Sequence, residues 1–341
     1  MKTFFRFGTK LPAWMAALLI LLPLVAALVC LTVGRYHLSI SQVLDALYCR
    51  ASGLPLDETV SSVVFNLRLP RILLAICLGA GLACAGAAFQ GLFGNPLATP
   101  DTLGVTSGAS VGAILALLAN RSSFTVQVIA LIFGLTTVFL TTMVAKRNGR
   151  TSIVMLVLSG TIISALLSAV VSILKYTADP LSKLPEITFW LMGSLSGTTY
   201  RSLLLGIPFI LVGVILLFLL RWRLNILTLS EDEAKSAGIQ VQKTRIVVII
   251  ASTMVTASCV SMCGQVGWVG LLIPHCARMI VGSNNRFVIP ISISLGAVFM
   301  LLVDTLARAM MSSEIPISIL TALIGAPFFI SLLRKTGGGW Q

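Results

Sequence analysis

The sequence predicts an all-α polytopic membrane protein with about ten transmembrane helices, and two observations support this fold class. Of the 341 residues, 57% are hydrophobic and only 10% are charged, and the mean hydropathy is +1.01. A soluble domain carries about a quarter charged residues. Apolar runs of about 18 or more residues, typical of spanning helices, recur along the chain. We therefore expect a single transmembrane domain over residues 1–341.

Eight apolar runs are long enough to cross a bilayer, and two shorter runs complete the expected ten spans. The long runs cover 12–33, 71–92, 124–145, 152–174, 202–220, 246–263, 287–307 and 315–333, and the shorter ones cover 104–120 and 267–281. The first run could also be a signal peptide, because basic residues precede it. No small-x-small cleavage site follows it, which favours an uncleaved first helix.

The net charge of +13 could suggest a nucleic-acid-binding protein, but the distribution of the charges argues against one. With ten spans and a cytoplasmic N-terminus, fifteen of the 24 Lys and Arg residues lie on the inner side and nine on the outer side. This excess follows the positive-inside rule. The basic residues therefore orient a membrane protein.

Two arginines stand at the expected outer end of the second span. Arg68 and Arg71 flank Pro70, a residue that suits the first turn of a helix, so we expect both arginines at a helix N-terminus. Their positive charge is unfavourable at that end of the helix dipole. One interpretation is that they extend to lipid headgroups. The other is that they receive carboxylates from an outside partner.

The same span is rich in small residues between 79 and 91, which allow close helix approach. After it, Asn95 and Pro96 predict either a broken helix beside a translocation path or a plain cytoplasmic turn. Hydroxyl groups on the span 152–174 are typical either of a wet path or of helix packing. The candidate path residues are Asn95, Pro96, Ser159, Gly160 and Ser164.

The inner loop 221–245 is the longest cytoplasmic loop and contains a complete set of helix signals. Ser230 and Glu233 form the pattern of a capping box, and Gly238 is a C-terminal stop signal. They predict a helix of about seven residues, which is too short to be stable alone in water. We therefore expect it to dock on a soluble partner.

Two smaller patterns also predict local structure. Ser39 and Gln42 fit a capping box at the start of a short outer helix, expected to cover the membrane surface or the bundle. Asp304 and Arg308 lie four residues apart near the outer end of the ninth span, so an intrahelical ion pair is possible.

No pattern in the sequence predicts an enzyme. The phosphate-binding motif G-x-x-x-x-G-K-[ST] is absent, as is any nucleophile–base arrangement. Six of the seven cysteines lie in apolar segments, and no histidine or carboxylate completes a metal set around Cys259 and Cys263. We expect a non-catalytic membrane subunit without a cofactor of its own.

Five segments together resemble one family over nearly the whole chain. They are RLPR at 68–71, GNPLATPDTLGVTSGASVG at 94–112, GWVGLLIPH at 267–275, DTLAR at 304–308 and EIPISILTALIGAPFF at 314–329. The chain resembles FecCD-type permeases of bacterial ABC importers for iron-siderophores, haem and vitamin B12. The resemblance implies the type II ABC-importer permease fold and a location in the bacterial inner membrane. It also implies a second permease subunit as homodimer partner, two ATPase subunits that bind ATP and Mg²⁺, and a periplasmic binding protein.

The resemblance also implies roles for particular residues. Arg68, Arg71 and Arg308 would dock the binding protein. The ATPase would couple to Ser230, Glu231, Asp232, Glu233, Ala234, Lys235, Ser236, Ala237 and Gly238. The expected cargo is a ferric siderophore, or a related chelate such as haem or cobalamin. The alternative is a secondary transporter driven by an ion gradient, which would need intramembrane carboxylates, and only Asp304 qualifies.

Overall fold

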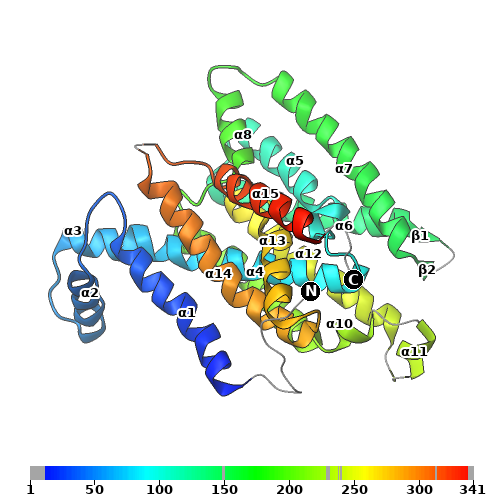
Figure 1. Ribbon diagram of the computed structural model, residues 1–341. Coiled ribbons are helices and arrows are strands. Elements are labelled where there is room, and N and C mark those ends of the chain that lie inside the picture. Colours follow the sequence, from blue (N-terminus) through cyan, green and yellow to red (C-terminus); the bar gives the residue numbers. More distant parts are fainter. Residues whose placement is uncertain are drawn as a thin grey trace.

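The computed structural model describes residues 12–147, 150–227, 231–236, 238, 240–311 and 313–336, which form a bundle of helices (Figure 1). The α-helices are α1 (Ala13–Thr32), α2 (Ile40–Ser52), α3 (Glu58–Ser61), α4 (Leu69–Phe93), α5 (Val105–Leu118), α6 (Ser123–Ala145), α7 (Ile153–Tyr176), α8 (Lys183–Met192), α9 (Tyr200–Leu220), α10 (Arg223–Ile226), α11 (Glu231–Ser236), α12 (Val241–Cys263), α13 (Val269–Val281), α14 (Asn285–Ala309) and α15 (Ile317–Thr336). A π-helix, η1 (Ser62–Arg68), joins α3 to α4, and a 3-10 helix, η2 (Pro100–Leu103), precedes α5. Two short antiparallel strands, β1 (Lys146–Arg147) and β2 (Arg150–Thr151), connect α6 to α7.

The described helices confirm the predicted set of ten spans. Seven helical segments are long and apolar enough to cross a membrane: Ala13–Thr32, Glu58–Phe93, Ser123–Ala145, Ile153–Tyr176, Tyr200–Leu220, Val241–Cys263 and Asn285–Ala309. Three shorter apolar helices, Val105–Leu118, Val269–Val281 and Ile317–Ser331, complete the ten. The two spans predicted to be short, 104–120 and 267–281, correspond to α5 and α13.

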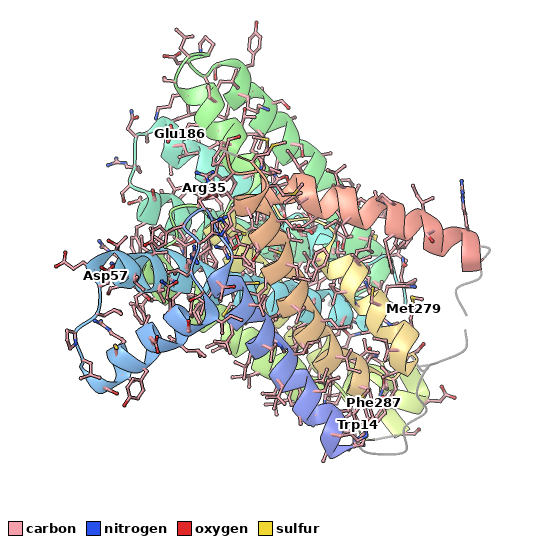
Figure 2. All side chains as sticks on the ribbon, turned by 60° about the vertical axis from the view of Figure 1, so that its left-hand side comes forward. Trp14, Arg35, Asp57, Glu186, Met279 and Phe287 are labelled. Carbon is pink, nitrogen blue, oxygen red and sulfur yellow. The ribbon has the colours of Figure 1, made fainter. Side chains whose placement is uncertain are left out.

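The two ends of the bundle separate the residues predicted for the two sides of the membrane. Figure 2 shows Trp14, Met279 and Phe287 toward one end, and Arg35 and Glu186 toward the other. The first group begins α1, ends α13 or begins α14, whereas the second group lies in outer loops or on α8. We call the end that holds Arg35 and Glu186 the outer end.

Helix α4 is the centre of the bundle, because α9, α12, α13 and α14 all pack against it. Its small residues make this possible. A Cβ atom added to Gly79 would lie 2.0 Å from the carbonyl oxygen of Gly296 on α14, and one added to Gly86 would lie 1.9 Å from that of Gly270 on α13. Backbone therefore packs directly on backbone, as predicted for residues 79–91.

The prediction that Arg68 and Arg71 stand at a helix N-terminus holds for α4, which begins at Leu69 with Arg68 as its N-cap and Pro70 in its first turn, but the helical backbone does not begin there. The helical backbone is continuous from Glu58 to Phe93. Pro70 lies inside this long helix and removes one backbone donor, and the wider π-turns of η1 directly precede it. The free, positively polarised N-terminus is thus about two to three turns earlier, where the side chain of Asp57 caps α3 by accepting from Val60 N at 2.9 Å.

The short outer helix α2 confirms the predicted capping box. Ser39 Oγ accepts from Gln42 N at 3.2 Å, and Gln42 Oε1 accepts from Ser39 N at 2.8 Å. The helix continues to Ser52 and ends at Gly53, which has a φ of 67°. Such a left-handed residue is a common helix stop.

Candidate docking, coupling and translocation residues

The three arginines expected to dock a partner lie close together at the outer end of the bundle. We define the outer charge cluster as Arg68, Arg71, Asp304, Arg308 and Glu314. Residues from α4 and η1 meet residues from α14 and the segment that follows it, more than 230 positions away in the sequence. The sequence predicted only the pair within α14, and the tertiary structure adds the rest.

Arg71 is the bridging cation of the outer charge cluster. Its Nε donates to Asp304 Oδ1 at 2.7 Å, and its Nη1 donates to both carboxylate oxygens of Glu314 at 2.8 and 2.9 Å. The Asp304 side chain is 1% exposed, whereas that of Glu314 is 28% exposed. Charge-assisted hydrogen bonds of this kind are the stronger ones in proteins. Arg71 therefore ties α4 to α14 and to the segment between α14 and α15.

Arg68 and Arg308 stabilise the C-terminal end of α1. Arg308 Nη1 donates to Val33 O at 2.6 Å and Nη2 donates to Cys30 O, while Arg68 donates to the carbonyls of Leu31 and Tyr36. The last carbonyls of a helix lack partners within the helix and carry partial negative charge. Two guanidinium groups satisfy them here. The positive charges of Arg68 and Arg308 therefore stabilise the fold, because they face the C-terminus of α1 and its partial negative charge.

Gly34 separates the two guanidinium groups. A Cβ atom on this residue would lie 2.7 Å from Arg68 Nη2 and 3.0 Å from Arg308 Nη1. A side chain at this position would therefore displace one or both guanidinium groups from their places at the end of α1. Arg308 also contacts Asp304 within its own helix, with 3.5 Å between Nε and Oδ2, which confirms the predicted intrahelical pair.

The geometry bears directly on the two interpretations of the arginines. Arg68 and Arg308 are 6% and 9% exposed, so their guanidinium groups bond inside the chain in this conformation. Neither interpretation, headgroup contact or partner docking, anticipated this internal role. Docking on Arg68, Arg71 and Arg308 stays a prediction.

Sequence reasoning missed Glu314 and Gly34 as members of this site. The sequence places Glu314 only in the segment that follows the ninth span and predicts no partner for its carboxylate. Its role could have been inferred from the scarcity of acids, because the chain has only 11 Asp and Glu residues for 24 Lys and Arg residues. An acid between two spans on the outer side is a natural partner for a nearly buried arginine.

The predicted coupling helix is present in the part of the loop that the structure describes. Helix α11 covers Glu231–Ser236, which is six residues, close to the predicted seven. Gly238 has a φ of 76°, consistent with the predicted stop. Ala234 is buried, and α11 packs on α12. Ser230 and Ala237 lie outside the described residues, and so does the capping box.

The candidate path residues on α7 pack against the segment around η2. Ser159 is buried, and a Cβ atom on Gly160 would lie 2.0 Å from Thr102 O. Ser164 Oγ would lie 3.0 Å from a Cβ atom on Gly104, whose φ is 83°. Within this chain these residues therefore pack helix α7 on η2. A role in lining a path stays a prediction.

Asn95 and Pro96 form a turn at the end of α4. Gly94 ends the helix with a φ of 58°, and Asn95 Oδ1 then accepts from Leu97 N at 2.9 Å. Asn95 is exposed and Pro96 is half-buried. This local geometry is that of a turn after a complete helix, the second of the two interpretations.

Among the described residues, no group of three or more His, Cys, Asp and Glu could hold a metal ion.

Comparison with known proteins identifies the family. The FecCD transport family matches residues 20–335. This chain belongs to that family. It is 45% identical over 322 residues to the molybdate import system permease protein MolB of Haemophilus influenzae, covering 94% of this chain and 95% of that protein. A Helicobacter pylori protein, named as a probable iron chelatin transport system permease protein, is 37% identical over 281 residues, covering 82% of this chain and 85% of that protein.

A solved structure supports the same assignment. It is described as an inward-facing conformation of a metal-chelate type ABC transporter, and it matches with a TM-score of 0.86 and 42% identity over 95% of this chain and 100% of that chain. This FecCD protein is therefore a multi-pass membrane protein and the permease of an ABC importer. The predicted family and the type II importer fold are confirmed.

Proposed function

We propose that this FecCD permease imports a small metal-containing ligand, with molybdate as the first candidate. The observation that carries this proposal is the 45% identity to the molybdate permease MolB along nearly the full length of both chains. A ferric siderophore is the second candidate, supported by the 37% identity to the iron chelatin permease. The substrate expected from the sequence alone was the siderophore, and the higher identity now favours the oxyanion.

The same proposal includes the partners of the chain. A second copy of the permease, two ATPase subunits and a periplasmic binding protein would complete the importer in the inner membrane. Support for a second copy comes from α7, of which only 17% of the spanning window is buried inside one chain. Its exposed residues Ile162, Leu166 and Ile173 leave an apolar face for a second copy or for lipid. The positive-inside distribution supports a cytoplasmic N-terminus.

Within this proposal, docking carboxylates of the binding protein would reach Arg71. Its partner Glu314 is the most exposed member of the outer charge cluster, so the approach from outside leads past Glu314. Arg71→Gln should weaken binding of the binding protein, and Arg121→Gln, an exposed outer arginine outside the cluster, is the matched control. Equal affinity of both variants and the unchanged protein would exclude docking at Arg71.

Uptake into proteoliposomes tests the substrate and the energy source. The chain is reconstituted with the ATPase and binding protein encoded beside it, with and without internal ATP, and with labelled molybdate or ferric siderophore outside. ATP-dependent uptake of molybdate that requires the binding protein would support the first candidate. Uptake of the siderophore alone would favour the second. Uptake without ATP that stops when the ion gradient is removed would support a secondary transporter, with Asp304 as its first carboxylate to study.

A further inference from the structure

A cavity lies at the inner end of the bundle, where α9 passes into α10 and α12 begins. Its volume is about 330 Å³. The lining residues are Leu220, Trp222, Arg223, Gly238, Gln240, Lys243, Thr244 and Val247. Among the lining residues, only Gly238, at the end of the predicted coupling region, has a role discussed above.

The charge of this cavity is positive. Arg223 and Lys243 line it and are exposed, and no acidic residue is among the lining residues. Arg221 lies beside Arg223 in sequence. Burial and the neighbouring charge of Arg286 lower the pKa of Arg221, which indicates an excess of positive charge on this surface. Glu233 on α11 is exposed and is not among the residues that line the cavity.

The first turn of α12 contributes further donors to the cavity. Gln240 precedes this 23-residue helix without a side-chain cap, and the first turn contains no acid. The first amides of a helix lack partners within the helix, and they attract anions. Thr244 is 4% exposed and lines the cavity, and its hydroxyl makes no hydrogen bond to any described residue. The cavity thus contains a buried hydroxyl donor beside two cations.

Part of the lining of the cavity is apolar and adjoins exposed apolar helix faces. Leu220 and Val247 line the cavity, and the adjoining faces of α9 and α12 expose Leu219 and Ile246. Trp222 is 48% exposed at the end of α9. Tryptophan is enriched at the level of lipid headgroups. An anion in this cavity would therefore have hydrocarbon on one side and the aqueous interface on the other.

We propose that this cavity binds the phosphate group of an anionic phospholipid of the inner leaflet. Arg223 and Lys243 pair with the phosphate, Thr244 Oγ1 and the first amides of α12 donate to its oxygens, and the acyl chains lie along the exposed faces of α9 and α12. A lipid is favoured over a soluble phosphate because apolar residues line the same cavity as the cations. The proposal concerns the chain itself and is independent of the transported substrate.

Native mass spectrometry of the purified full chain in detergent tests the site. The probes are phosphatidylglycerol and phosphatidylcholine of equal chain length, so that the two lipids differ only in the headgroup, which is anionic in the first and zwitterionic in the second. Near a membrane surface each basic residue contributes about 1 kcal/mol. Arg223→Gln with Lys243→Gln should therefore reduce the preference for phosphatidylglycerol by roughly 25-fold.

The control variant is Lys146→Gln with Arg334→Gln, which removes two exposed cations that are predicted for the inner side and do not line the cavity. It should keep the preference. Thr244→Val keeps the shape and all charges, and it should still weaken phosphatidylglycerol binding by several-fold. Equal losses in the cavity and control variants, or no effect of Thr244→Val, would mean diffuse attraction to the surface and would overturn the proposal.

Inorganic phosphate distinguishes the two sources of the same chemistry. If millimolar phosphate, at constant ionic strength, displaces phosphatidylglycerol completely, the cavity is a soluble-phosphate site and the lipid assignment is wrong. Retained lipid binding supports it. Loss of lipid binding when a soluble ATPase partner is added would instead assign this surface to the partner. None of these three results depends on whether molybdate or a chelate is transported.

Discussion

Asp304→Asn is the most informative test of the outer charge cluster. The substitution keeps the size of the side chain and removes its charge at a position that is 1% exposed. Arg71 loses its 2.7 Å partner, and Arg308 loses its contact at 3.5 Å. Removing one partner of a buried ion pair costs about 3–5 kcal/mol, because the remaining charge stays buried. Arg71 keeps Glu314 and Arg308 keeps two carbonyls, so we expect a loss of about 3 kcal/mol.

The measurement is the free energy of unfolding of the full chain, obtained by titrating mixed micelles with a denaturing detergent. Glu186→Gln is the matched control, because it removes the charge of an outer carboxylate that pairs with Lys183 at 2.9 Å and is 47% exposed. Exposed pairs contribute about 0–1 kcal/mol. If Asp304→Asn and Glu186→Gln cost the same within about 1 kcal/mol, the outer charge cluster is not the stabilising network described here.

Three further predictions concern packing, capping and pH. Gly86→Ala places a Cβ atom 1.9 Å from a carbonyl oxygen of α13 and should destabilise the bundle by about 1–3 kcal/mol or more in the same titration, whereas Gly267→Ala, with no atom within 4 Å of the added Cβ, should not. Ser39→Ala removes the cap of α2 and should increase hydrogen exchange in α2 by the equivalent of about 1 kcal/mol, and unchanged exchange would contradict the capping role. Hydrogen bonds from the backbone and side chain of the following turn lower the pKa of Asp179, so its contribution to this outer turn is complete above the unfolded pKa of about 3.9 and is lost as the pH falls through the lower folded value. Protection of the Leu181 amide, which donates to Asp179 Oδ1 at 2.8 Å, should fall over that range. It should be absent at all pH values in Asp179→Ala, which removes the acceptor, and independent of pH in Asp179→Asn, which keeps an acceptor oxygen without a titratable proton.

Several features were predictable because they depend on neighbouring residues. The spans follow from the length of apolar runs, and the boundaries of α5 and α13 agree with the two runs identified as short. The capping box of α2 depends on a hydroxyl and an amide three residues apart. The close approach of α4 to its neighbours follows from its small residues, because without side chains the backbones can touch.

The arginines show where such local reasoning fails. The sequence rule for Pro70 predicted a helix start, and α4 does begin at Leu69, but the π-helix η1 ends at Arg68 directly before it, so the helical backbone starts earlier, at Glu58. The rule describes the commonest position of proline, and it contains no information about the π-turns that accommodate one inside a helix. The electrostatic argument then placed Arg68 at the wrong helix end, because the helix that it stabilises is α1, which lies more than 30 residues earlier.

The sequence by itself determined the solvent of this protein, its apolar spans and its family. These properties depend on composition and on patterns within about twenty residues. Only the tertiary structure decided the partners of the charged groups: Arg71 with Glu314, Arg308 with the end of α1, and Thr244 with two cations around a cavity. The physical reason is that a charge at membrane depth must find a partner wherever packing brings one close, and packing joins segments that are far apart in the sequence.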